Sequence, residues 1–166
     1  MIKRKEVKTK GSVKSITTSK RKKEKITQKQ RNVAFFIDGE NISYKKAEQA
    51  VEIVKARGMV CSGRVYGLQK DESTKGWSEK AKKLGIMDIR LSGSPEKDKV
   101  DKKMQKDIKN VASWAENIDI VCIISSDGGF SDTAKQLIKQ GKWVVGLGEK
   151  KTPGKLRNSC SEFIDI

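Results

Sequence analysis

From residue 32 onward, short apolar runs alternate with segments in which apolar and polar positions recur at helical spacing. Five runs are rich in apolar residues over most of their length, which is typical of strands buried on both faces of a parallel sheet. These runs are 33–38, 59–68, 86–91, 118–125 and 142–148. Four segments between them repeat apolar residues every three or four positions and are predicted to be helices. The predicted helices are 44–56, 77–85, 100–115 and 131–140.

The alternation of strands and helices predicts an α/β protein, a three-layer α/β/α sandwich built on a mostly parallel five-stranded sheet. The length of the patterned region, residues 32–166, suits a single domain with a sizeable core. Residues 92–99 are rich in Ser, Gly and Pro and are predicted to form a loop. The tail contains Leu156, Phe163 and Ile164, and we expect it to pack back against the sheet.

Cysteine and tryptophan side chains are interpreted as structural. Cys61 and Cys122 lie inside apolar runs and no CxxC spacing is present, so buried thiols are favoured over a disulfide or a zinc site. The tryptophans Trp77, Trp114 and Trp143 are interpreted as packing residues.

Residues 1–31 differ from the rest of the chain in both charge and pattern. They hold thirteen basic and two acidic residues, a net charge of +11 out of +16 for the whole chain, and show no sustained apolar periodicity. We interpret this segment as a disordered basic arm, because it has almost nothing to bury. Its function is either a tether for nucleic acid, since Lys and Arg release counterions from a polyanion, or a solubilising tail. The candidate RNA-binding residues of the arm include Lys3, Arg4, Lys20, Arg21, Lys22 and Lys23.

Several classes of protein are disfavoured by what the sequence lacks. No apolar run has transmembrane length and no signal peptide is recognisable, so we expect a cytoplasmic protein with no membrane partner. The chain has no histidine, which excludes Ser-His-Asp catalysis and His-ligated zinc. The glycine-rich segment 146–154 lacks both GxGxxG and Walker spacing, so we expect no nucleotide cofactor.

Acidic residues follow two of the predicted strands. DGEN places Asp38 and Asn41 after the first strand, and SSDGGFSD places Asp127 and Asp132 after the fourth. Turn formation or helix capping explains either cluster alone. Together they are better explained by a site, because ligands bind beyond the carboxyl ends of parallel strands.

The predicted helix 100–115 adds two more carboxylates. At 100° per residue, Asp101 falls inside the apolar arc of this helix and Asp107 falls at its edge. A core-facing carboxylate must be paired, hydrogen-bonded or bound to metal, although Asp101 also suits a helix cap. Converging carboxylates without histidine suit Mg²⁺ or Mn²⁺, which would activate water for hydrolysis of a nucleic-acid backbone.

The segments FFIDGENI, KVDKKMQKD and IISSDGGF, followed by a helix and GKWVVGLG, resemble the NYN domain, a branch of the PIN-like ribonucleases. The resemblance covers roughly residues 32–166, with the motifs in family order and spacing. It implies a metal-dependent nuclease that usually acts on RNA, and we expect single-stranded RNA to be the partner. It also implies a strand order of 3-2-1-4-5.

The resemblance assigns roles to individual residues. Asp38, Asp101 and Asp127 match acids of the family and would be metal ligands, directly or through water. Asn41 and Ser125 would orient phosphate or metal-bound water.

Five further positions are connected with these roles. Lys99, beside Asp101, could hold a phosphate oxygen. Asp107 matches a further family acid. Gly129 stands where the family has its second acid after strand four, and Ser126 replaces the usual glycine. Asp132 lies one helical turn after Gly129 and is, with Asp107, a further candidate ligand.

Three functions follow from these residues. The leading hypothesis is a Mg²⁺- or Mn²⁺-dependent ribonuclease with an Asp cluster at the carboxyl ends of the strands. The first alternative is an RNA-binding module of the same fold, weakened in catalysis because Gly129 replaces an acid. The second is phosphoryl transfer on a small molecule, for which Asp38 would be the nucleophile and Glu40 the second acid.

Overall fold

The computed structural model describes residues 30–69, 75–94, 96, 98–114 and 117–166. Strands and helices alternate along this part of the chain. The strands are β1 (Asn32–Asp38), β2 (Met59–Leu68), β3 (Met87–Leu91), β4 (Ile120–Ile124), β5 (Trp143–Gly148) and β6 (Glu162–Asp165). The α-helices are α1 (Ala47–Lys55), α2 (Lys75–Leu84), α3 (Lys99–Trp114), α4 (Ser131–Lys139) and α5 (Gly154–Arg157). The described ranges contain no helix long and apolar enough to cross a membrane.

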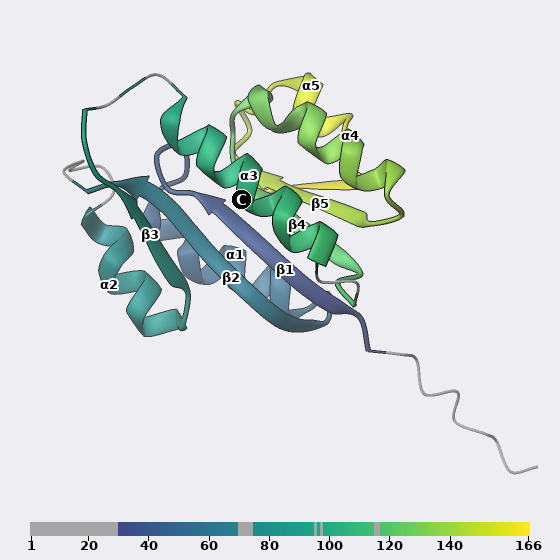
Figure 1. Ribbon diagram of the computed structural model, residues 1–166. Helices are drawn as coiled ribbons and strands as arrows, with labels where there is room; N and C mark the ends of the chain where they lie inside the picture. The colour runs from purple at the N-terminus through teal and green to yellow at the C-terminus, as the bar shows by residue number, and fades with distance from the viewer. Residues whose placement is uncertain (1–29, 70–74, 95, 97, 115–116) are drawn as a thin grey trace, which may run out of the picture.

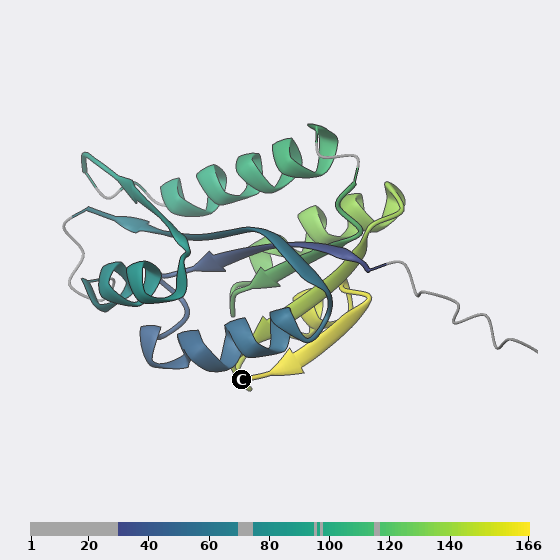
Figure 2. The same ribbon diagram turned by 90° about the horizontal axis from the view of Figure 1, so that it is seen from below.

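All of these strands are parallel, and they follow the order β3-β2-β1-β4-β5-β6 across one sheet. Figures 1 and 2 show α3 and α4 covering one face of the sheet and α1 and α2 covering the other. The predicted α/β/α sandwich and the strand order 3-2-1-4-5 are therefore confirmed. The chain moves outward in one direction from β1 to β3 and in the other from β4 to β6, so the carboxyl ends of β1 and β4 flank the point where a ligand crevice forms in such folds.

Strand β1 contributes to both apolar layers, which explains why it is apolar at nearly every position. Phe35 and Ile37 face the layer beneath α1 and α2. Phe36 faces the opposite layer, where it meets Met104 and Ile108 of α3. The strand ends at Asp38, which is fully buried like the apolar residues before it. The core therefore holds this carboxylate rigidly at the tip of the central strand.

The sheet has one strand more than the sequence predicted. β6 pairs with β5 from Val145 opposite Glu162 to Gly148 opposite Asp165. It is only four residues long and only partly buried, so no continuous apolar run marks it in the sequence. The expectation that the tail returns to the sheet is confirmed, with Leu156 fully buried and Phe163 packed against the core.

Two expectations about individual side chains are wrong. Cys61 is exposed, because the first half of β2 is only partly covered by helices. Trp143 is 47% exposed at the first residue of β5. Cys122 and Trp77 are buried as predicted, whereas the side chain of Trp114 lies outside the described residues.

Candidate active site

Asp38 is the centre of a hydrogen-bond network at the end of β1. One carboxylate oxygen, Oδ1, accepts from the backbone amides of Glu40 and Asn41, each at 3.3 Å. The other, Oδ2, accepts from the Asn41 side-chain amide and from the Ser125 hydroxyl, each at 2.7 Å. Burial raises the pKa of Asp38, and the hydrogen bonds from Ser125 and Asn41 act against that rise. The network therefore stabilises a carboxylate where water does not reach it.

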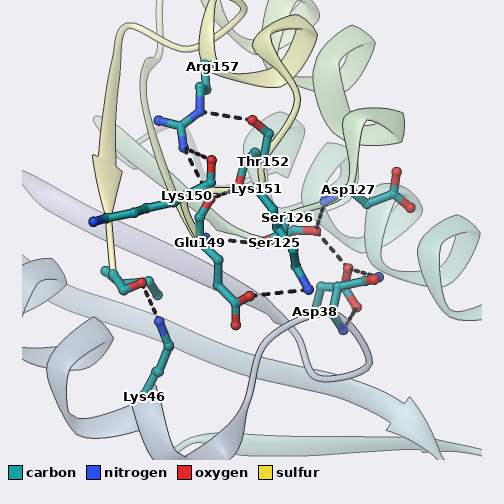
Figure 3. Close-up of polar contacts among 12 residues, drawn as sticks. Asp38, Lys46, Ser125, Ser126, Asp127, Glu149, Lys150, Lys151, Thr152 and Arg157 are labelled. Carbon is teal, nitrogen blue, oxygen red and sulfur yellow. Dashed lines mark hydrogen bonds and ion pairs between the residues drawn. The ribbon is translucent and has the colours of Figure 1, made fainter.

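Ser125 connects the ends of β1 and β4. Its hydroxyl donates to Asp38 and accepts from the backbone amide of Asp127 at 3.0 Å. Figure 3 shows this chain of contacts from Asp38 through Ser125 to Asp127, with the Asp127 carboxylate directed away from Asp38. The Asp127 carboxylate accepts from the Gly129 amide at 2.8 Å and so caps the 3-10 turn η3 (Gly128–Phe130). Asp127 is thus tied to Asp38 through a serine, with its carboxylate left at the site's outer edge.

Asp101 lies at the start of α3 near both of these acids. Its Oδ1 is buried and has no hydrogen-bond partner. The pKa of Asp101 is raised to about 7, first by burial, then by the negative charges of Asp38 and Asp127 and by a hydrogen bond to Asp127 that only the protonated form can make. A proton or a cation is needed to stabilise this group of carboxylates.

A cavity of about 290 Å³ opens beside Asp101. Its lining residues are Asp98, Asp101, Lys102, Gln105, Asp127 and Gly129. Asp98 has a left-handed backbone, with φ of 63°, and its negative charge also raises the pKa of Asp101. A non-glycine residue in this conformation is strained by about 1–3 kcal/mol, and such strain is concentrated at functional sites. Sequence analysis missed Asp98, although its position three residues before Asp101 could have indicated a further acid.

The residues of this site fit a divalent cation in part. The buried, unpartnered oxygen of Asp101, next to the Asp127 carboxylate, is the oxygen-ligand chemistry that Mg²⁺ and Mn²⁺ prefer. Over the ranges that the structure describes, no three acidic or thiol side chains are gathered tightly enough to form a complete metal cage. Mg²⁺ is commonly held by one or two carboxylates together with water and substrate phosphates, so an incomplete cage agrees with this type of binding.

Asp107 lies on the same helix but has other partners. One of its oxygens accepts from the Tyr66 hydroxyl at 3.0 Å and lies 3.6 Å from Arg64, and the other is 2.8 Å from the Lys103 ammonium group. Tyr66 is fully buried. The role of Asp107 as a ligand stays a prediction, but these contacts show that it stabilises the packing of α3 on β2.

Of the remaining predicted residues, the two that the structure describes, Lys99 and Asp132, do not line the cavity. Lys99 donates to the carbonyl of Ser92 at 2.7 Å, so its ammonium group holds the loop before α3. Asp132 is exposed and is not part of the cavity lining. The basic residues Lys3, Arg4 and Lys20 to Lys23 lie outside the described residues. The structure thus gathers Asp38, Asn41, Ser125, Asp101 and Asp127 at one place and leaves Lys99 and Asp132 outside the cavity lining.

Close packing at Gly39 positions the loop that carries Asn41. The Gly39 amide donates to the Tyr66 carbonyl at 2.9 Å, and a Cβ atom at Gly39 would lie 2.6 Å from the same oxygen. The indole N–H of Trp77 donates to the Ile42 carbonyl at 3.0 Å and holds the other end of the loop. Sequence analysis missed both positioning contacts, because each joins residues far apart in the chain.

Ser126 and Arg157 fix the loop after β5 beside the site. The Ser126 hydroxyl accepts from the Glu149 amide at 2.9 Å. Arg157 donates to the carbonyls of Glu149, Lys150 and Thr152, at 3.0–3.2 Å (Figure 3). The serine that replaces the family's usual glycine therefore has a structural contact of its own.

Comparison with known proteins gives the family but no specific activity. The chain is similar to the crystal structure of a protein of unknown function from Vibrio parahaemolyticus, with a TM-score of 0.70 and 19% identity over 84% of this chain and 95% of that one. It also matches an oxidoreductase from Sinorhizobium meliloti at a TM-score of 0.44 and 14% identity, covering 83% of this chain and 36% of that one, a likeness too weak to carry an argument. No significant match is found among curated proteins. The NYN domain model matches residues 32–166, and the chain therefore belongs to the NYN domain family of PIN-like nucleases.

Proposed function

We propose that the protein is a Mg²⁺- or Mn²⁺-dependent ribonuclease that hydrolyses single-stranded RNA. The observation that carries the proposal is Asp101, whose buried oxygen has no partner and whose pKa is raised by burial and by the charges of Asp38 and Asp127. Membership of the NYN family supports nuclease chemistry. The excess positive charge of the chain supports a polyanionic substrate and, with the absence of membrane-spanning features from the sequence, a cytoplasmic site of action.

Each residue has a part in this function. Asp101 and Asp127 hold the metal at the cavity. Asp38 does not line the cavity, and the hydrogen bonds from Asn41 and Ser125 hold it in place and oppose the rise in its pKa that burial causes. A bound divalent cation would polarise the phosphate and lower the pKa of an attacking water. These side chains therefore supply binding, orientation and negative charge at one edge of the sheet.

A second candidate function is RNA binding without efficient cleavage. Gly129 provides no side chain at the position of a family acid, and the Asp127 carboxylate already caps η3. Phosphoryl transfer on a small molecule is disfavoured, because Asp38 is fully buried and its two oxygens accept four hydrogen bonds. Such a carboxylate has no oxygen free to attack a phosphoryl group.

The proposal is tested by incubating the purified chain with end-labelled single-stranded RNA and DNA in Mg²⁺, in Mn²⁺ and in EDTA. We expect RNA cleavage that requires metal and that falls at least about 10- to 100-fold in Asp38→Asn and Asp101→Asn, as for groups that hold or support a metal. Asp88→Asn is the matched control, since Asp88 of β3 pairs with Arg90 on the same strand and with Ser78 of α2 and does not line the cavity.

The outcomes separate the candidate functions. Cleavage by Asp38→Asn at the parent rate, or cleavage that persists in EDTA, contradicts the proposal. Tight RNA binding by the parent chain without cleavage in either metal supports the binding module instead. An acid-stable, hydroxylamine-sensitive phosphoenzyme would indicate phosphoryl transfer.

A further inference from the structure

The outward face of α3 is a row of lysines. Lys102, Lys106 and Lys109 are exposed, and at 100° per residue they fall within about 60° of one another around the helix. Within the described residues, none of the three forms an ion pair or a side-chain hydrogen bond. Their positive charges are therefore directed into solvent without partners, and we refer to these three residues as the α3 lysine row.

The signs of charge on α3 are segregated in a way that the other long helices do not share. Both acids of α3 face inward, Asp101 toward the cavity and Asp107 toward Tyr66. By contrast, α1 carries Glu48 and Glu52 with Lys55, and α4 carries Asp132 with lysines. A solvated helix is ordinarily stabilised by mixed charges, and a row of one sign costs repulsion. The α3 lysine row is therefore better explained by an anionic ligand than by solubility.

One end of the row begins at the candidate active site. Lys102 lines the same cavity as Asp101 and Asp127. The row then continues away from the cavity along the helix, with Lys106 about 6 Å and Lys109 about 10.5 Å from Lys102 along the axis. This length matches about three phosphates of a stacked single strand at about 3.4 Å each.

The other end of the row points toward Asn32, the residue that follows the basic segment 1–31 in the chain. Asn32, the first residue of β1, is hydrogen-bonded through its side chain to the Asn117 carbonyl at 2.9 Å and through its amide to Asp119 at 2.8 Å. In the chain, two residues separate the end of α3 at Trp114 from residues 117–119. Figure 1 likewise shows the end of α3 and the start of β1 at the same edge of the sheet. The cavity, the α3 lysine row and Asn32 at the start of β1 thus follow one another along the direction of α3.

We propose that a single-stranded RNA lies along α3, with its phosphates on Lys102, Lys106 and Lys109, one end in the cavity and the other toward the end of α3 near Asn32. The inference rests on the proposed function for the class of ligand. It adds a path for the strand, which family membership does not give. Ammonium groups bind phosphates as point charges and read no base, so the row would bind RNA without sequence preference.

The test uses the full-length chain carrying Asp38→Asn, so that binding is measured without cleavage. Lys102, Lys106 and Lys109 are replaced together by Gln, and binding to a fluorescent 12-nucleotide oligo(U) is followed by anisotropy between 50 and 200 mM salt. We expect the slope of log K against log salt to fall by about 2, since each phosphate contact on a single strand contributes about 0.7. We also expect Kd to rise at least about tenfold at 150 mM salt.

A matched control removes three charges elsewhere. Lys45, Lys55 and Lys82 are exposed residues on or next to α1 and α2, on the opposite face of the sheet. Their joint replacement by Gln should change Kd less than about twofold and leave the salt slope nearly unchanged. Equal weakening by both triple variants, or no weakening by the α3 variant, overturns the proposed path. Folding of the α3 variant is verified by a melting temperature that is no lower than that of the parent, since removing like charges relieves repulsion.

Two further arms of the experiment separate the path from related possibilities. Oligo(dT) of the same length replaces oligo(U), and a greater loss on DNA than on RNA would contradict RNA as the ligand of the row. The α3 variant is also assayed for cleavage with Asp38 restored. If the parent chain binds along α3 but never cleaves, the path stands and the nuclease proposal fails. If the variant cleaves and binds like the parent, the nuclease proposal stands and the path fails.

Discussion

The Ser125 hydroxyl lies 2.7 Å from Asp38 Oδ2 and joins the carboxyl ends of the two central strands, β4 and β1. Both side chains are fully buried. The same hydroxyl accepts from the Asp127 amide, so its proton is directed toward Asp38 and its orientation is fixed from both sides. One small side chain therefore lowers the pKa of the buried Asp38 carboxyl and also holds the backbone of Asp127.

This relationship predicts the effect of Ser125→Ala. The variant removes a hydrogen bond to a buried charged group, which should lower the free energy of unfolding by about 1.5–3 kcal/mol. Because the Ser125 hydrogen bond lowers the pKa of Asp38, its loss should raise that pKa further. We expect RNA cleavage at pH 7 to fall and to recover in part at higher pH, as measured by cleavage rates from pH 6 to 9.

The neighbouring variant Ser126→Ala is the control for Ser125→Ala. Its hydroxyl contacts the Glu149 amide and not Asp38. It should therefore leave the pH profile of cleavage unchanged, whatever it does to stability. Identical profiles for the two variants would show that Ser125 does not act through Asp38.

A second prediction concerns the pH dependence of stability. The pKa of Asp101 is raised from an ordinary value of 3.8 to about 7 in the folded protein. Between these values the folded chain keeps a proton that the unfolded chain has lost, so the free energy of unfolding should decrease as pH rises from about 4 through about 7. Denaturant unfolding in EDTA from pH 4 to 8 measures this decrease.

Two comparisons assign the decrease to Asp101. Asp101→Asn is neutral at every pH and should show a smaller decrease over the same range. Added Mg²⁺ or Mn²⁺ binds the ionised form, so it should raise the melting temperature of the parent more at pH 8 than at pH 6. A pH dependence that is the same in Asp101→Asn and the parent would exclude this origin.

The sequence predicted the central part of this arrangement for a physical reason. Asp38 and Asp127 follow buried parallel strands, so the topology alone brings them to one edge. The apolar arc of α3 likewise placed Asp101 toward the core. These arguments need only periodicity and strand direction, which are local properties of the chain.

Other features could not be predicted because they depend on contacts across the fold. The exposure of Cys61 and Trp143 is decided by which parts of β2 and β5 the helices leave uncovered. The left-handed conformation of Asp98 is set by the loop that enters α3. The need for glycine at position 39 arises from the Tyr66 carbonyl, which lies on a neighbouring strand. Such tertiary contacts leave no periodic signal in the sequence.

A third prediction follows from the charge of residues 1–31. Deleting this segment removes a net charge of +11 and, by its composition, almost no core residues. We expect RNA affinity and its salt dependence to fall while the melting temperature stays within about 2 °C of the parent, the shift expected for less than about 1 kcal/mol. An unfolded truncated chain, or an unchanged salt slope, would contradict the interpretation of the segment as a tether.

The last prediction concerns Gly129→Asp, which places a carboxylate where the family has one. A Cβ atom at Gly129 would lie 3.4 Å from Asp127 Oδ1, an ordinary contact, so the side chain fits beside the Asp127 carboxylate. Without metal, the added charge should repel Asp127 and Asp101 and lower the melting temperature. With Mg²⁺ or Mn²⁺, it should supply a further oxygen ligand, tighten metal binding and increase the stabilisation by metal.

Gly128→Asp is the matched control for this variant. It adds the same charge one residue earlier, where the Cβ atom would lie 3.6 Å from Pro153 and away from the acids. We therefore expect the melting temperatures of the two variants, measured in EDTA and during a metal titration, to respond differently to metal. If added metal raises the melting temperature more in Gly129→Asp than in the parent and in Gly128→Asp, the missing carboxylate at position 129 limits metal binding. Equal rises in melting temperature in the two variants would contradict a metal next to Asp127.

A third outcome is that metal raises the melting temperature of the parent as much as that of Gly129→Asp. Asp132→Asn then tests whether Asp132 supplies the missing carboxylate, because only in that case should this substitution abolish the rise in melting temperature.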